Sequence, residues 1–169
     1  ESSAAFLQSN IWFNSASETG GGVLTSVDDT TYFYRSNISY NSAPEGAGMA
    51  NVDGSTAIIK ECGFAYNNAT TYGGAILNAT AAAPSFDICR IYGNNAANGA
   101  GVLNSGASPL FVNTYIAHNE ATSAGGGVVN NEGGAPRFIN CNIMHNVAPL
   151  AGGIANNNAT CYITNSIVY

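Results

Sequence analysis

The side chains that could carry catalytic or metal chemistry in this chain are ten carboxylates, two histidines and four cysteines. Polysaccharide lyases and hydrolases need carboxylates that converge on one face, or a basic residue that abstracts a proton. Of the acids, only Asp28, Asp29 and Asp53 share a loop position in successive copies of the repeat described below. They form a weak candidate calcium site, because no third copy adds a ligand. A solvated loop is the favoured interpretation.

The two histidines lie 27 residues apart, and each directly precedes an asparagine. If that spacing is one coil of a stacked structure, His118 and His145 lie about 5 Å apart. Such a pair could bind a metal, but no carboxylate or cysteine is placed to complete the ligand shell. Stacked rings are the favoured interpretation, since aromatic residues hold the same position in other copies: Phe13, Tyr40, Tyr66 and Tyr169.

The four cysteines form no CxxC pair and no Cys/His spacing typical of zinc sites. Three hold one position of the repeat, two residues before an apolar residue, together with small polar residues: Ser9, Ser36, Cys62, Cys89, Thr114, Cys141 and Asn165. Buried thiols are expected, and a Cys62–Cys89 disulfide between adjacent coils is the alternative. No Ser-His-Asp arrangement can be assembled. The sequence therefore predicts no catalytic residue, no bound metal and no cofactor.

The elements that would position these residues come from a repeat of 25 to 27 residues. It is marked by one asparagine per copy: Asn14, Asn41, Asn67, Asn94, Asn119 and Asn146. An apolar residue stands three before each: Ile11, Ile38, Phe64, Ile91, Ile116 and Ile143. A second apolar column precedes it by five: Phe6, Phe33, Ile59, Phe86, Phe111 and Phe138, then Tyr162 leading to Ile167. Glycine clusters follow, then a further polar column of Thr25, Asn51, Asn78, Asn104, Asn130 and Asn156.

Short apolar stretches separated by glycine and asparagine are poor helices and suit strands of three to five residues. The leucine framework of leucine-rich repeats is absent, and a propeller blade would need a longer repeat. The sequence predicts an all-β fold, a right-handed parallel β-helix with about six full coils of ~26 residues and a partial seventh. Residues 1–169 are expected to form one domain, either a segment of a longer repeat protein or an uncapped subunit.

Coils about 4.8 Å apart would stack equivalent residues into ladders. A stacked asparagine can bond the amide of the next one and the turn backbone, so buried polar groups are satisfied. Asparagine also tolerates the left-handed backbone that a sharp turn requires. We therefore expect the six marker asparagines to form a structural ladder.

Composition excludes several functions. Only 8% of residues are charged, the net charge is −6 and four residues are basic, so a patch for nucleic acid or an anionic membrane surface is not expected. The sequence contains no run of 18 apolar residues, so we expect no membrane-spanning helix.

The segment Phe64–Ile76, FAYNNATTYGGAI, resembles the FxxN and GGAI repeats of the polymorphic outer-membrane protein family. Other copies often have Ile where that family favours Phe, and some break the glycine half, as in GAGM. The resemblance implies a β-helical passenger that is secreted or displayed at the cell surface and is often adhesive. Such proteins also carry a membrane-embedded β-barrel, which we do not expect residues 1–169 to form.

The first functional hypothesis is a non-enzymatic extracellular scaffold or adhesin, with specificity in loops such as Val27–Thr31 and Asn131–Gly134. Its expected partners are proteins or other copies of the chain that meet uncapped ends. The alternative is a β-helix that binds or degrades polysaccharide, with Trp12, Tyr92 or Tyr115 as an aromatic platform. Four N-glycosylation sequons add a possible glycan, at Asn37, Asn68, Asn78 and Asn158.

Overall fold

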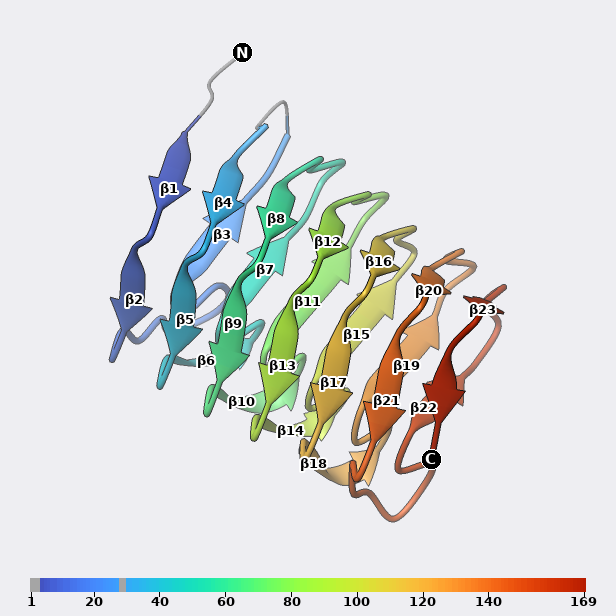
Figure 1. The fold of residues 1–169 in the computed structure, drawn as a ribbon. Helices are drawn as coiled ribbons and strands as arrows, with labels where there is room; N and C mark the ends of the chain where they lie inside the picture. Colours follow the sequence, from blue (N-terminus) through green and yellow to red (C-terminus); the bar gives the residue numbers. More distant parts are fainter. Residues whose placement is uncertain (1–3, 28–29) are drawn as a thin grey trace.

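A computed structural model describes residues 4–27 and 30–169, and the strands within them form four parallel sheets (Figure 1). Sheet 1 contains β1 (Ala5–Leu7), β4 (Tyr32–Tyr34), β8 (Ile58–Lys60), β12 (Ser85–Asp87), β16 (Leu110–Val112), β20 (Arg137–Ile139) and β23 (Tyr162–Thr164). Sheet 2 contains β2 (Asn10–Trp12), β5 (Asn37–Ser39), β9 (Gly63–Ala65), β13 (Arg90–Tyr92), β17 (Tyr115–Ala117), β21 (Asn142–Met144) and β24 (Ile167–Val168). Sheet 3 contains β6 (Ser42–Glu45), β10 (Asn68–Tyr72), β14 (Asn95–Asn98) and β18 (Glu120–Ala124). Sheet 4 contains β3 (Val23–Thr25), β7 (Met49–Asn51), β11 (Ile76–Ala79), β15 (Val102–Ser105), β19 (Val128–Asn131) and β22 (Ile154–Asn156).

Each coil crosses the sheets in turn and then joins the next coil. In Figure 1 the front strands run downward and the chain returns upward behind them, while successive coils advance from left to right. That winding is right-handed. The pairing partners are equivalent residues one repeat apart, such as Phe33 with Ile59 and Ile38 with Phe64. The predicted right-handed parallel β-helix of about six full coils is confirmed, and the described residues contain no helix at all, hence none suited to crossing a membrane.

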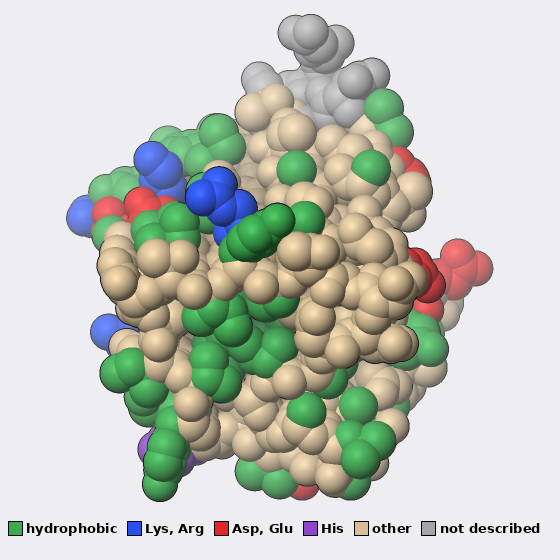
Figure 2. All heavy atoms as spheres, turned by 90° about the vertical axis from the view of Figure 1, so that its right-hand side faces the viewer, with side chains coloured by type: hydrophobic (Ala, Val, Ile, Leu, Met, Phe, Trp, Pro, Cys, Tyr) green, Lys and Arg blue, Asp and Glu red, His purple; other side chains and the backbone are tan. Residues whose placement is uncertain are grey.

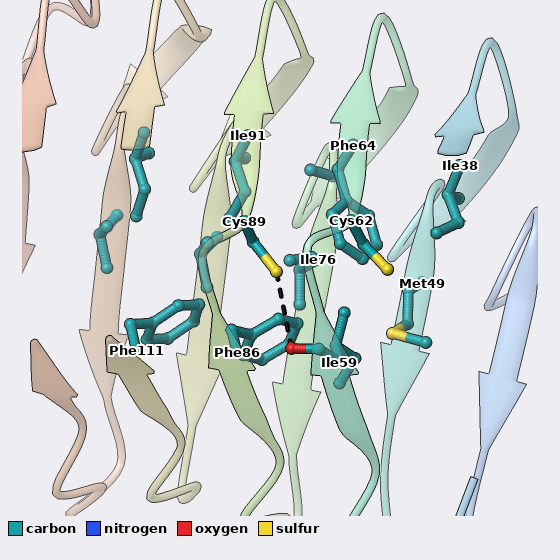
Figure 3. Close-up of a cluster of buried hydrophobic side chains, with 14 of the residues drawn as sticks. Ile38, Met49, Ile59, Cys62, Phe64, Ile76, Phe86, Cys89, Ile91 and Phe111 are labelled. Atoms are coloured by element: carbon teal, nitrogen blue, oxygen red, sulfur yellow. Dashed lines mark hydrogen bonds between the residues drawn. The ribbon is translucent and has the colours of Figure 1, made fainter. Parts of the chain in front are cut away.

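The core is built from columns of apolar side chains, mainly phenylalanine in one and isoleucine in the other. Phe6 stacks on Phe33 with ring centroids 4.7 Å apart, and Phe111 lies 4.6 Å from Phe86 and 4.9 Å from Phe138. The column of Ile38, Phe64 and Ile91 faces these rings from sheet 2 (Figure 3). Such rows bury apolar surface along the whole axis, and each stacked aromatic pair adds roughly 0.5–1.5 kcal/mol.

The predicted register is wrong by one residue in the seventh coil. Phe138 pairs with Ile163 rather than Tyr162, and Ile143 pairs with Val168 rather than Ile167. Ser166 rather than Asn165 therefore continues the cysteine column, and its hydroxyl accepts from the backbone N–H of Cys141. Tyr162 and Ile163 are both apolar enough for a core position, so sequence pattern could not separate them. A one-residue slip exchanges the inner and outer faces of a strand.

The left-handed turn residues are not the ladder asparagines, contrary to the prediction. Positive φ falls on the residue before each asparagine, for example 55° at Tyr40 and Tyr66 and 54° at His118. A second corner, between sheets 1 and 2, has the same conformation: Gln8, Arg35, Glu61, Ile88, Asn113, Asn140 and Asn165. The asparagine side chain instead turns inward. The residue before each asparagine consequently points outward, so the side chains at this corner form a column on the surface.

The glycines allow adjacent coils to approach closely. A Cβ at Gly74 would lie 2.4 Å from the carbonyl oxygens of Ala100 and Asn95, both in the next coil.

At the C-terminal side of Figure 1, which faces the viewer in Figure 2, hydrophobic side chains gather in the middle of the surface. The last coil contributes Ile163 and Val168, whose equivalents in earlier coils are buried.

Candidate functional site

The predicted asparagine ladder is present, and its interior side chains are fully bonded. The backbone N–H and Nδ2 of Asn67 both donate to Oδ1 of Asn94, at 2.9 and 3.0 Å. The second hydrogen of Nδ2 goes to the carbonyl oxygen of Ile38 in the preceding coil, 3.0 Å away. Oδ1 of Asn67 accepts both donors of Asn41. The same acceptor pattern links all six asparagines, so the ladder holds coils together.

A second ladder runs along the inner face of sheet 4 through Thr25, Asn51, Asn78, Asn104 and Asn130, one residue from each of five strands. Each Nδ2 donates to the next Oδ1 at 2.8 Å, and all five side chains are buried. The ladder stops at Asn130, whose buried Nδ2 has no hydrogen-bond partner among residues 4–27 and 30–169. The next residue of the column, Asn156, is exposed and bonds the carbonyl of Ala159 instead.

Aromatic rings along the outward corner that precedes each ladder asparagine form a continuous ladder, which we call the flank ladder: Phe13, Tyr40, Tyr66, Tyr92, His118, His145 and Tyr169. Tyr92 and Tyr169 come from one residue before the corner position, and for Tyr169 this differs from the prediction because the seventh coil is shifted by one residue. Its neighbouring ring centroids are between 5.1 and 5.9 Å apart. His118 and His145 stack at 5.2 Å with planes 23° apart, which confirms the stacked-ring prediction. Their faces are turned to each other, so the pair is not arranged as a metal site. The ring atoms are nevertheless exposed to solvent along the rod.

Tyr92 departs from the regular stack. Its coil has Gly93 at the corner, where a Cβ would lie 2.8 Å from the Tyr66 ring. Tyr92, one residue earlier on β13, fills the gap with its plane at 90° to Tyr66 and 64° to His118. The faces of the Tyr92 ring are therefore not directed along the ladder, unlike those of Tyr40.

Tyr92 borders a hollow of about 650 Å³ on the outer face of sheet 2, which we call the flank groove. Gly63 and Ala65 on β9 give it a low floor, because both lack a bulky side chain. Arg90 and Tyr92 on β13 lie beside them in register. The remaining outward-facing lining consists of Tyr115 on β17 and the corner residues Ile88 and Asn113.

The groove combines apolar rings with polar side chains, of which the Arg90 guanidinium makes no side-chain contact to a hydrogen-bond or ion-pair partner among the described residues. Arg90 is exposed, and the ion pair found within residues 4–27 and 30–169 joins Arg35 to Glu61 at 2.7 Å. Asn113 bonds Asp87 at 3.2 Å and accepts from Asn140 at 3.4 Å. Tyr115 stands beside Arg90 as its register partner on the next strand. A guanidinium and an amide thus border an apolar surface, as in small-molecule sites.

The structure brings together two of the three aromatic residues predicted as a platform. Tyr92 and Tyr115 share the groove, whereas Trp12 lies three coils away beside Phe13, 6.0 Å between ring centroids. Sequence reasoning missed Arg90, Ile88 and Asn113. The available signal was a drop in side-chain size at two outward positions of one coil, Gly63 and Ala65, next to larger residues in the following coil.

The structure describes one of the three weak calcium candidates. Asp53 lies in an exposed turn with φ 50°, whereas Asp28 and Asp29 lie outside the described residues. Within the described part, no three His, Cys, Asp or Glu side chains cluster in a way that could hold a metal ion.

Two carboxylates border a second hollow of about 220 Å³ near sheet 4. Glu45 and Glu132 line it together with Tyr72 and Ser105, and the Ser105 hydroxyl donates to Glu132. The two glutamates belong to coils two and five, so three coil rises, about 14 Å along the axis, separate their backbones.

All four cysteines are free thiols, so the Cys62–Cys89 disulfide is not formed. The Cys89 thiol donates weakly to the carbonyl of Ile59 at 3.6 Å (Figure 3). Burial raises the pKa of Cys89 to about 12 and raises the pKa of Cys62 and Cys141 as well. The thiols therefore stay neutral at ordinary pH and act as small core residues.

The four sequon asparagines differ in exposure. Asn37, Asn68 and Asn158 are exposed, whereas Asn78 is fully buried within the second ladder. A glycan on Asn78 is incompatible with this fold, because the amide nitrogen that would carry the sugar lies inside the coil.

Comparisons with protein-family models, with curated proteins and with solved structures find no match for this chain.

Proposed function

We propose that this chain is a non-enzymatic scaffold of adhesin type that acts outside the cell and binds saccharide along its flank. The observation that carries the proposal is the flank ladder. Seven rings follow one edge from the first coil to the last, and Phe13, Tyr40 and Tyr66 are 74%, 50% and 47% exposed. Exposed apolar rows of this kind mark binding surfaces.

The interior supports a structural role for the rest of the molecule. Both amide ladders link every coil they reach to its neighbours, so the flank is held on a rigid support. Rigid presentation lowers the entropy cost of binding an extended polymer. The sparse charge and polar amide surface favour contacts made by rings and hydrogen bonds over contacts made by ion pairs.

Retention on insoluble polysaccharides tests the proposal. A panel of cellulose, chitin and cross-linked polygalacturonate is mixed with the purified chain, and the unbound fraction is measured. The double variant Tyr40→Ser/Tyr66→Ser is expected to lose most retention. Tyr72→Ser is the matched control, because Tyr72 is 42% exposed on β10 and outside the flank ladder. Wild-type chain that binds no member of the panel, or a double variant retained like wild type, overturns the proposal.

A further inference from the structure

We infer that the flank groove is a subsite for an acidic sugar unit, with Arg90 binding the sugar carboxylate. The inference rests on the proposed function, because it assigns a ligand class to one part of the same flank. Shape, charge and ring orientation each support it.

The shape fits a compact ligand. A hollow of about 650 Å³ falls within the range of about 300–1,000 Å³ typical of small-molecule sites. Every strand that borders it is paired on both sides within sheet 2. A peptide therefore cannot enter by adding a strand at this place, and recognition has to use side chains.

The charge favours an anion. The chain has a net charge of −6, yet the groove is bordered by Arg90, whose guanidinium has no ion-pair partner among the described residues. Asp87, a carboxylate that contacts the lining, accepts a hydrogen bond from Asn113 and forms no ion pair with Arg90. A guanidinium presents parallel N–H donors that match the two oxygens of a carboxylate.

The rings favour a sugar over a free small acid. Tyr92 is turned out of the ladder, with its plane at 90° to that of Tyr66, and it lines the groove beside the floor of Gly63 and Ala65. The apolar C–H face of a pyranose can lie on such a ring while its hydroxyls reach Asn113 and the phenol of Tyr115. Ile88, 54% exposed, extends the apolar wall. A hexuronic acid carries both the apolar face and the carboxylate.

Isothermal titration with oligogalacturonate and with the uncharged galacto-oligosaccharide of equal length tests the inference. We expect wild type to prefer the acidic oligomer at least tenfold. Arg90→Gln should remove that preference by lowering the affinity for the acidic oligomer alone. Arg90→Lys should keep part of the preference. Arg137→Gln is the matched control, since Arg137 is exposed on β20 outside the groove, and it should change either affinity less than twofold.

A second variant fills the groove. Gly63→Asn copies the residue at the same outward position of the preceding coil, Asn37, and the added Cβ would meet only the end of that side chain at 3.0 Å. We expect this variant to fold and to bind both oligomers at least tenfold more weakly than wild type does. A sulfated galactan oligomer identifies the acid group, and equal or tighter binding of the sulfate ester overturns the carboxylate assignment.

The outcomes separate the two proposals. Equal affinity for charged and uncharged oligomers, or an Arg90→Gln variant that keeps the preference, overturns the inference and leaves saccharide binding by the flank standing. Failure of both oligomers to bind, together with no retention on the insoluble panel, overturns the proposed function as well.

Discussion

The side chain of Asn67 makes all four of its possible hydrogen bonds. One of these and a hydrogen bond from the backbone N–H connect Asn67 to Asn94 in the next coil. Nδ2 and the backbone N–H of Asn67 lie 3.0 and 2.9 Å from Oδ1 of Asn94. Each asparagine in the ladder interior thus accepts from the preceding coil and donates to the following one, with Nδ2 also reaching back to a carbonyl. The ladder is a structural device, and the residue before it is left free to face solvent.

Replacing Asn67 should therefore destabilise the fold strongly. Asn67→Ala leaves the two donors of Asn41 without their acceptor and the carbonyl of Ile38 without its donor. Buried groups without partners cost about 1–3 kcal/mol each, so we expect a loss of roughly 3 kcal/mol or more in urea unfolding. Asn68→Ala, one residue along and exposed, is the control and should change the free energy by less than about 0.5 kcal/mol. Equal effects would contradict the ladder account.

The buried thiols predict a loss of stability at alkaline pH. The pKa of Cys89 is raised to about 12 by burial, above the thiol's ordinary value. A group with a raised folded pKa contributes stability that is fully present below its unfolded pKa and is lost as pH rises toward the folded pKa. Between pH 8 and pH 10 we expect Cys89 to contribute roughly 1–2 kcal/mol of destabilisation. Cys89→Ser, which copies Ser36 of the same column, should have a shallower pH slope; an unchanged slope would refute the assignment.

The sequons should be used unequally when the chain is secreted from a eukaryotic host. Asn37, Asn68 and Asn158 are exposed and are expected to carry glycans, whereas folded protein should carry none at Asn78. Peptide mass spectrometry measures the occupancy of each site. Thr160→Ala should remove one glycan from Asn158, and Thr80→Ala should leave the mass of the glycans unchanged. A glycan found on Asn78 in cooperatively folding protein would contradict the buried ladder.

The proposal that the chain is not an enzyme is tested at Glu45 and Glu132, the two acids that line the smaller hollow. Retaining and inverting glycosidases hold their carboxyl groups about 5–5.5 and 6.5–9.5 Å apart. Glu45 and Glu132 start from backbones about 14 Å apart along the axis, and Glu132 is held by Ser105. We expect no release of reducing ends from the polysaccharide panel. Release by wild type that disappears in Glu45→Gln or Glu132→Gln would show catalysis in this hollow.

The sequence was informative where columns repeat and uninformative where one coil differs from the others. Six asparagines in step predicted the ladder, and the Phe33-to-Phe138 column predicted the core, because each position is sampled many times. The seventh coil is sampled once, and Tyr162 and Ile163 satisfy the same pattern, so the register predicted for that coil was wrong. The groove also depends on a single coil. Its depth comes from Gly63 and Ala65, whose small size looks unremarkable in a glycine- and alanine-rich chain until the neighbours Arg90 and Tyr92 are placed beside them.

Hydroxyl-radical footprinting with bound polysaccharide tests saccharide binding by the flank most directly. Oxidation of each aromatic residue is measured by mass spectrometry with and without the saccharide that the chain retains best. We predict that oxidation of Tyr40, Tyr66 and Tyr92 falls severalfold on binding, while that of Tyr72, on another face, stays constant. Protection centred on Tyr72, or no protection of the flank ladder under saturating saccharide, would contradict the account.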